Sequence, residues 1–481
     1  MIKKLLASPS VIYLTSRYGT YFIQFINSLF IAVYLGPLYL GIWGFFNLVM
    51  QYFTQVNFGV PYSLNVMGSI NKQDNQKLTL ICNSGLLLTL ITSIAAIGCL
   101  FIIVLYFPEI GSKYRLLEFI LPLIIIVVTQ YFNTIFSNIY RVFGKLKEIS
   151  FSQSLLPLSI LIVSLFFRGE KLLYAMIWIN VIANVLILGV YLYNNPIKLN
   201  LQWNKPLIRA LLEKGLYLFI YTSSFYFIII SIRTIISHYY TVEEFGFFTF
   251  FYTLANIFIL LLNSITFLIT PKMLNKFAHS EVEEAERFIQ KLRKDYIVLA
   301  HLLMQLSLLF FPVFLQFFPT YNSTLFGFRL IVLSIVLYTN GFGYQGLLMA
   351  KHKEKNLAIV SVVAFLINLS VAFIIVEFLN LSYEYVIIAT MVSYLFFVLA
   401  NGISGIKLLK GTSTWKLLLK AVIPHYIMLP YLLALILTLL NVNNWLFILP
   451  LLLFIILNLE NLLGSFKTAK KMINDPQYIN I

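Results

Sequence analysis

The amino-acid sequence predicts an all-α protein that crosses a membrane about 14 times, because segments of the ~20 apolar residues that a spanning helix needs recur along its whole length. Its composition supports this fold class: 60% of the residues are hydrophobic and 11% are charged, against roughly 25% charged residues in soluble domains. The basic residues also gather in alternate connections between the apolar segments. Lipid, and not water, is therefore the expected solvent for most of the chain.

The predicted membrane spans follow one another closely, separated by short polar or turn-forming stretches. They lie at residues 14–36, 39–66, 78–106, 117–142, 148–168, 172–194, 214–240, 246–271, 295–318, 324–350, 356–379, 384–406, 416–440 and 444–466. The tightest connections are Gly36-Pro37, after the first span, and Thr241 to Phe245, after the seventh.

The distribution of Lys and Arg predicts the orientation of these spans, because cytoplasmic connections of membrane proteins are enriched in both residues. With the N-terminus in the cytoplasm, all but six of the 34 Lys and Arg residues fall on the cytoplasmic side. The exceptions are four outer residues, Lys113, Arg115, Arg168 and Lys171, and two in outer portions of spans, Arg233 and Arg329. We therefore expect an even number of spans, with both termini in the cytoplasm.

This orientation also explains the formal charge of +16, since the basic connections face the anionic lipids of the inner leaflet. Membrane lipids, and not nucleic acid, are the expected partners of these connections.

One connection carries an acidic run, Glu281 to Glu286, followed by Arg287, Lys291 and Lys294. That pattern predicts a solvated amphipathic helix between the spans at 246–271 and 295–318.

Two pairs of matching segments indicate an internal repeat. Residues 34–46 and 239–251 share a Tyr, a Gly and two Phe at an offset of 205 residues, and 145–148 resembles 351–354 at an offset of 206. Each copy would contain six spans, so both copies would insert in the same orientation and be related by a pseudo-twofold axis along the membrane normal. Parallel repeats of this kind are typical of transporters, which bind substrate between the two halves.

The repeat predicts how the chain divides into domains. The expected parts are a first six-helix bundle, a cytoplasmic linker, a second six-helix bundle, and two additional helices with a cytoplasmic tail. They occupy residues 1–194, 195–213, 214–408 and 409–481, respectively.

Several local patterns resemble those of one known family. These are Leu35-Gly36-x-x-x-Leu40-Gly41 between the first two spans, Asn57-Phe58-Gly59-Val60 near the end of the second, and Arg141-x-x-x-Lys145-x-Lys147 after the fourth. Together with the length and the plan of six, six and two spans, they resemble the Wzx-type polysaccharide flippases of the multidrug/oligosaccharidyl-lipid/polysaccharide exporter superfamily. Members of that family often place an acidic residue beside an arginine in the seventh span, whereas this chain has Ile232-Arg233.

The resemblance implies a function. The substrate would be a polyprenyl-diphosphate-linked oligosaccharide of the O-antigen or capsule type, used in lipopolysaccharide or other polysaccharide biosynthesis. It would move from the inner to the outer leaflet of the bacterial inner membrane by alternating access, through a central cationic cavity. The resemblance also implies glycan polymerase or assembly proteins as partners. It implies coupling to H⁺ or Na⁺ as well, but the chain has Ile232 where the family often has an acidic residue beside the arginine, so ion coupling is left open. No cofactor is implied.

Arginines within the spans are the first candidate substrate-binding residues, because a buried guanidinium can bind a diphosphate through paired, charge-assisted hydrogen bonds. Arg17 shares a helical face with Gln24, and the repeat places Tyr226 and Arg233 on the equivalent face of the seventh span. Arg17 would lie toward the inner end and Arg233 toward the outer third. The alternative is that both side chains extend to lipid headgroups. Arg329 is a further candidate, with an interfacial anchor as its alternative.

Amide side chains form the second group of candidates. Asn47, Gln51 and Gln55 follow one another at helical spacing in the second span, and Asn256 occupies the position of Gln51 in the second half. Amides offer both donors and acceptors, which suits sugar hydroxyls. The alternative is that they hold neighbouring helices together.

The sequence has no nucleotide-binding Gly-x-x-x-x-Gly-Lys-Ser/Thr loop and no paired carboxylates in the spans, so we expect a transporter and not an enzyme. Two other functions remain open. A multidrug or small-cation antiporter would need acidic residues in its cavity, and a glycan polymerase or ligase would resemble enzymes with a large outer loop. The outer connections here are all short.

Overall fold

The computed structural model describes residues 9–474 apart from 56, 72, 107 and 202, and the side chains of these residues apart from 9–15, 103–105, 110, 214–218, 221–222, 257–272, 275, 278 and 466–474. Within the described residues every regular element is a helix. Ten helices are long and apolar enough to cross a membrane, and one bent pair adds an eleventh. The prediction of an all-α polytopic membrane protein is confirmed.

The predicted count of 14 is roughly consistent with this number. The first candidate span, Ser16–Gln55, covers two predicted spans that meet at a break in the helix. Two further helices, α9 (Lys205–Tyr239) and α10 (Val242–His279), are not among the candidate spans because many of their side chains fall outside the described residues. With 35 and 38 residues they are long enough to cross ~30 Å of hydrocarbon.

The chain forms two compact units, and the boundary between them passes through α9 and α10. Unit 1 comprises Met1–Phe219 and Tyr240–Thr249, and unit 2 comprises Ile220–Tyr239 and Phe250–Ile481. The predicted domain limits at residues 194, 213 and 408 follow the repeat instead, and they stay predictions.

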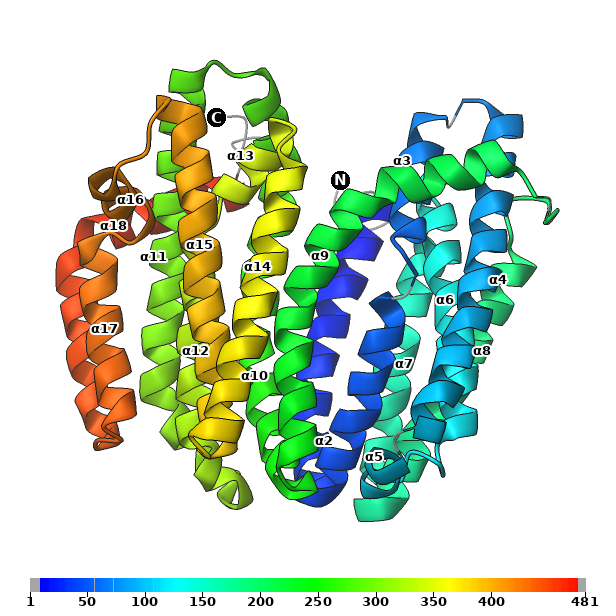
Figure 1. Ribbon diagram of the computed structural model, residues 1–481, viewed down its shortest axis with the longest axis horizontal. Helices are drawn as coiled ribbons and strands as arrows, with labels where there is room; N and C mark the ends of the chain where they lie inside the picture. The colour runs from blue at the N-terminus through cyan, green and yellow to red at the C-terminus, as the bar shows by residue number, and fades with distance from the viewer. Residues whose placement is uncertain (1–8, 56, 72, 107, 202, 475–481) are drawn as a thin grey trace. The chain divides into compact units, whose positions relative to one another are not determined.

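In unit 1 the helices pack around a shared apolar core that includes Leu64, Ile81, Ile135 and Ile139. Helix α2 packs on α7 and α8, α6 packs on α8, and α3 and α4 pack on α6 (Figure 1). The elements are α2 (Pro9–Gln55), α3 (Val60–Ile70), α4 (Asn75–Tyr106), α5 (Pro108–Lys113), α6 (Ile120–Val142), α7 (Leu146–Phe166) and α8 (Gly169–Tyr193), with the first parts of α9 and α10.

In unit 2, α15 packs on α12 and α14, and α18 packs on α11 and α17, which lies beside it at the orange and red end of the chain (Figure 1). The core includes Ile228, Leu347, Phe397 and Val422. The elements after α10 are α11 (Val282–Leu315), η1 (Pro319–Thr324), α12 (Leu325–Thr339), α13 (Tyr344–Ala350), α14 (Glu354–Phe373), η2 (Ile374–Phe378), η3 (Tyr383–Val386), α15 (Ile387–Lys410), α16 (Trp415–Val422), α17 (His425–Leu439), η4 (Asn444–Phe447) and α18 (Ile448–Asn474).

The two predicted tight turns are present, and the sequence explains both. Gly36 interrupts α2 with φ 70° and ψ 172°, a conformation that favours glycine, and Pro37 then starts the next helical stretch. Before α10, the Thr241 hydroxyl accepts from the backbone N–H of Glu244 at 3.1 Å, and the Glu244 carboxylate accepts from the backbone N–H of Thr241 at 2.8 Å. This reciprocal capping box fixes the start of α10.

Several predicted boundaries are wrong. The amphipathic helix predicted around Glu281–Lys294 is not separate from the span at 295–318, because no helix breaker stands between them and both form the single helix α11. This part of α11 is amphipathic, with Ala285 and Ile289 buried and Glu283 and Glu284 exposed. The span predicted at 324–350 is two helices, α12 and α13, separated by a turn that ends at Gly343 with φ 87°.

The span predicted at 416–440 is also two helices. Helices α16 and α17 meet at a 73° bend, and Pro424 is the N-cap of α17. The span predicted at 39–66 is divided between the end of α2 and the start of α3, where Phe58 and Gly59 both take positive φ.

The predicted repeat recurs in the packing of aromatic side chains. In unit 1 the ring of Phe45 stacks on Tyr114 at a centroid distance of 4.1 Å, and in unit 2 the ring of Phe250 stacks on Tyr321 at 4.0 Å. Phe250 follows Phe45 by 205 residues, the offset read from the sequence. The corresponding tyrosines come from the connections that precede α6 and α12.

A second symmetric contact lies inside unit 1, where α2 meets the first residues of α10. A Cβ added at Gly41 would overlap the backbone oxygen of Val242, and one added at Gly246 would overlap the backbone oxygen of Pro37. Gly246 follows Gly41, and Val242 follows Pro37, by the same offset of 205 residues. Two backbones therefore approach each other closely at equivalent glycines, as small residues permit between membrane helices.

Candidate functional site

The unit 1 candidates start near the N-terminal end of α2. Arg17 is half-buried, and its Nε donates a hydrogen bond of 2.8 Å to the hydroxyl of Tyr21, one helical turn away. The guanidinium carbon also lies 5.7 Å from the centroid of the Tyr21 ring. Tyr21 is the partner that orients Arg17, and in the repeat it corresponds to Tyr226 of unit 2.

A different stripe of α2 makes the polar contacts with α7. The hydroxyls of Ser16 and Thr20 lie 3.0 and 2.8 Å from the Ser154 hydroxyl, and the amide of Asn27 donates to the backbone oxygen of Pro157 at 2.7 Å. Successive residues of a helix are rotated by about 100°. Arg17 therefore lies about a quarter of a turn around α2 from this α2–α7 contact.

The remaining unit 1 candidates differ in exposure. Gln24 is exposed, whereas Asn47, Gln51 and Gln55 are half-buried. The Asn47 amide donates to the backbone oxygen of Trp43 at 2.8 Å, so one of its donors is used inside its own helix. The three residues lie on one stretch of α2 beyond the break at Gly36.

In unit 2, two tyrosine side chains, one from α9 and one from α10, lie near Arg233. Arg233 is 2% exposed, and its guanidinium carbon lies 5.1 Å from the centroid of the Tyr252 ring. Tyr226 is half-buried and lies within electrostatic range of both Arg233 and Tyr252. A cation held against an aromatic face in a dehydrated site is stabilised by ~2 kcal/mol. We call Tyr226, Arg233 and Tyr252 the Arg233 cluster.

The structure therefore brings together two predicted residues, Tyr226 and Arg233, and adds Tyr252 as a direct partner. Asn256 lies one turn beyond Tyr252 on α10 and is half-buried. Tyr252 occupies the repeat position of Asn47, which marks it as part of the same helical stripe. The contact between Tyr252 and Arg233 joins α10 to α9, so the residue spacing within either helix could not predict it.

Arg329 lies elsewhere in unit 2, in contact with the connection between α17 and α18. It is 1% exposed, its Nη2 donates to the Asn444 side-chain oxygen at 2.7 Å, and its guanidinium carbon lies 3.9 Å from the Phe447 ring centroid. These contacts fix the last two helices against α12. Substrate binding by Arg329, as by the other eight candidates, stays a prediction.

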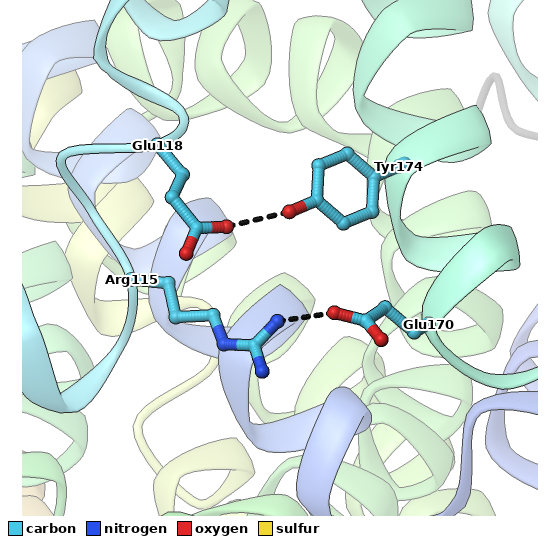
Figure 2. A network of polar contacts seen from close by, with 4 residues as sticks. All are labelled: Arg115, Glu118, Glu170 and Tyr174. Carbon is cyan, nitrogen blue, oxygen red and sulfur yellow. Dashed lines mark hydrogen bonds and ion pairs between the residues drawn. The ribbon is translucent and has the colours of Figure 1, made fainter.

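Four side chains of unit 1 form a network between the segment before α6 and the start of α8 (Figure 2). The Arg115 guanidinium pairs with the Glu170 carboxylate, and the Tyr174 hydroxyl donates to the Glu118 carboxylate at 2.6 Å. Arg115 has φ 52°, a conformation uncommon for residues other than glycine. The sequence placed Arg115 and Glu170 in different connections and gave no signal for their pairing.

Comparisons with known proteins agree with this architecture. A family model described as "Polysaccharide biosynthesis protein" matches residues 7–277, more than half of the chain. No curated protein matches the sequence.

Among solved structures, the chain is similar to an inward-facing multidrug resistance MATE family transporter of the MOP superfamily. The TM-score is 0.68 at 16% identity, over 82% of this chain and 96% of that one. It is equally similar to the lipid II flippase MurJ in an inward closed conformation, with a TM-score of 0.68 at 14% identity, over 96% and 99% of the two chains. A MATE structure in the straight conformation has a TM-score of 0.56 at 15% identity, over 85% and 97%. These similarities show a shared fold.

Proposed function

Because the chain belongs to the polysaccharide biosynthesis protein family, we propose that it is a flippase for a polyprenyl-diphosphate-linked oligosaccharide. The oligosaccharide is a repeat unit of the O-antigen or capsule type. It moves from the inner to the outer leaflet of the bacterial inner membrane by alternating access, without chemical conversion. The transporter fold shared with the lipid II flippase MurJ supports this proposal.

The observation that carries the proposal is the Arg233 cluster. A cation buried in a membrane helix is costly and is a functional candidate for that reason. The substrate's diphosphate must cross ~30 Å of hydrocarbon, where it would lose the water that solvates it. The Arg233 guanidinium, held over Tyr252 and beside Tyr226, offers charge-assisted donors in place of that water. Arg17, oriented by Tyr21, supplies a second cation in unit 1.

The orientation of the protein belongs to the same proposal. The asymmetry of Lys and Arg supports both termini in the cytoplasm, so the basic connections face the leaflet in which the lipid-linked oligosaccharide is assembled. Glycan polymerase or assembly proteins on the opposite side would consume the product.

The first test replaces Arg233. Arg233→Ala should lower the surface glycan by about tenfold or more at equal protein level, because a lost charge-assisted hydrogen bond costs ~1.5–3 kcal/mol. Arg233→Lys should retain part of the activity, since it keeps the charge and loses the planar fork. Surface glycan is measured on intact cells with a lectin or antibody, and Arg287→Ala, at an 82% exposed arginine of α11, is the matched control.

Variants of Tyr252 separate the ring from the hydroxyl. Tyr252→Phe keeps the aromatic face under Arg233 and should retain more activity than Tyr252→Leu, which removes it.

Normal surface glycan in Arg233→Ala, at normal protein level, would exclude Arg233 from the transport path.

A multidrug or small-cation antiporter is the second candidate, because the MATE transporter matches with the same TM-score as MurJ. The two functions predict different effects of Arg233, since a buried cation repels a cationic drug and attracts a diphosphate. Cells that produce the protein should accumulate cationic dyes as cells without it do. Dye export that depends on the protein would favour the antiporter.

A further inference from the structure

A pocket of about 340 Å³ lies in unit 2, and none of the residues predicted to bind substrate lines it. Its walls are the first part of α11, the end of α15, helix α16 and the start of α17, with Tyr344 from α13. The volume falls within the ~300–1,000 Å³ typical of small-molecule sites.

The lining of this pocket is strongly basic. Arg293, Lys294, Lys410 and Lys420 line it, and Glu286 is its one acidic residue. Glu286 is already paired, since its carboxylate lies 2.9 Å from the Lys410 ammonium. Among the described residues, no carboxylate lies within the 4.0 Å of an ion pair from Arg293, Lys294 or Lys420. The pocket therefore carries a net positive charge that the described residues do not neutralise.

Arg293 is the fixed centre of this charge. It is 4% exposed, and its two terminal nitrogens donate to backbone oxygens, Nη1 to Phe342 at 2.6 Å and Nη2 to Ala421 at 2.9 Å. Its guanidinium carbon also lies 4.2 Å from the Tyr344 ring centroid. These partners orient the guanidinium but carry no negative charge. Burial of a cation without a counter-charge is costly, so an anion that enters the pocket gains a strong interaction.

Helix α16 indicates where this anion comes from. It packs Leu418 and Val422 inward, at 2% and 0% exposure, and leaves Trp415 and Leu419 exposed at 70% and 48%. An amphipathic helix with an exposed Trp and flanking lysines, bent 73° from the next span, is typical of the membrane–water interface. Lys420 of this helix lines the pocket, so the pocket lies at the depth of lipid headgroups.

We propose that this pocket binds the phosphate group of an anionic phospholipid, with Arg293, Lys294 and Lys420 as its cationic partners. The acyl chains would remain in the bilayer beside α16 and α17. The site is separate from the Arg233 cluster in its residues and does not depend on what the protein transports.

The test uses the full-length protein in lipid nanodiscs. In phosphatidylcholine discs, added phosphatidylglycerol should raise the thermal midpoint, and native mass spectrometry should detect a retained phosphatidylglycerol molecule. Lys420→Gln and Lys294→Gln should each weaken this binding about fivefold, which corresponds to ~1 kcal/mol per basic residue near an anionic surface. Lys416→Gln is the matched control, because Lys416 is an exposed lysine of α16 that does not line the pocket.

Three outcomes would overturn the proposal. The first is the absence of any preference of the wild-type protein for phosphatidylglycerol over phosphatidylcholine. Lys416→Gln could weaken binding as much as Lys420→Gln, which would indicate general surface attraction and not a pocket. Inorganic phosphate or diphosphate added to phosphatidylcholine discs could raise the midpoint as much as phosphatidylglycerol, which would identify a soluble anion as the ligand. Arg293→Gln is a secondary variant, since loss of its bonds to Phe342 and Ala421 also affects folding.

Discussion

Buried arginines of this protein fall into two kinds, distinguished by what surrounds the guanidinium. All three guanidiniums lie near an aromatic ring, but Arg293 and Arg329 also donate to backbone or amide oxygens of other elements, whereas Arg233 lies against Tyr252 in the long helix α9. The sequence identified Arg233 from its position in an apolar run. It gave no sign that Arg293 is buried, because its neighbours Lys291 and Lys294 are typical of a solvated loop.

Lys113 gives a prediction for pH. Its ammonium donates to the backbone oxygen of Tyr240 at 2.6 Å, and partial burial lowers its pKa while nearby Glu244 opposes that shift. Since the pKa of Lys113 is lower in the folded state, the unfolded state binds more protons between the folded value and ~10.4, and stability rises with pH through that window.

The thermal midpoint of the wild-type protein relative to Lys113→Met should therefore increase from pH 8 to pH 10.5. The comparison removes the effect of other titrating groups, which both proteins share. A difference that decreases with pH would show that the negative charge of Glu244 dominates the pKa of Lys113.

At the level of helices, apolar periodicity was sufficient to place the spans, and breaks within them were harder to predict. Gly36-Pro37 and the Thr241–Glu244 capping box carry strong local signals, and both turns are confirmed. The bend at Pro424 and the turn at Gly343 interrupt runs that remain apolar on both sides, so composition alone could not reveal them. The prediction made the opposite error in α11, where a change from charged to apolar residues was taken as a boundary but lies within one continuous helix.

The close crossing of α2 and α10 predicts the effect of small substitutions. Gly41→Ala and Gly246→Ala would each place a methyl group against a backbone oxygen, and should destabilise the protein by ~1–3 kcal/mol. Gly98→Ala is the control, because nothing lies within 4 Å of a Cβ added there and alanine favours a helix. The thermal midpoint of the detergent-solubilised protein gives the comparison, and equal midpoints for all three variants would contradict the crossing.

For the whole molecule, the sequence predicted the fold class and the repeat offset. The family model places the chain in the polysaccharide biosynthesis protein family, and the similar solved structures share its fold. The pairing of Phe45 with Tyr114 and of Phe250 with Tyr321 shows the repeat at the level of single side chains. Contacts between distant helices, such as Tyr252 on Arg233, could not be predicted because they depend on how each helix is rotated against its neighbours.

The orientation across the membrane can be tested with a pair of cysteines at the two ends of α15. Ser382 and Thr412 are both exposed, and they lie before and after this helix. In a background with Cys82 and Cys99 replaced by serine, Ser382→Cys should react with a membrane-impermeant maleimide in intact cells, whereas Thr412→Cys should react only after lysis. The opposite pattern would place the termini outside.

The boundary between the two units has a consequence for synthesis of the protein. Unit 1 is not complete when its first continuous stretch ends at Phe219, because Tyr240–Thr249 also belongs to it. Until that segment leaves the ribosome, Lys113 lacks its acceptor at Tyr240, and Tyr114 lacks its edge contact with Phe245 at 5.9 Å. The first half of the protein must therefore remain partly assembled in the membrane while the first helical stretch of unit 2 is inserted.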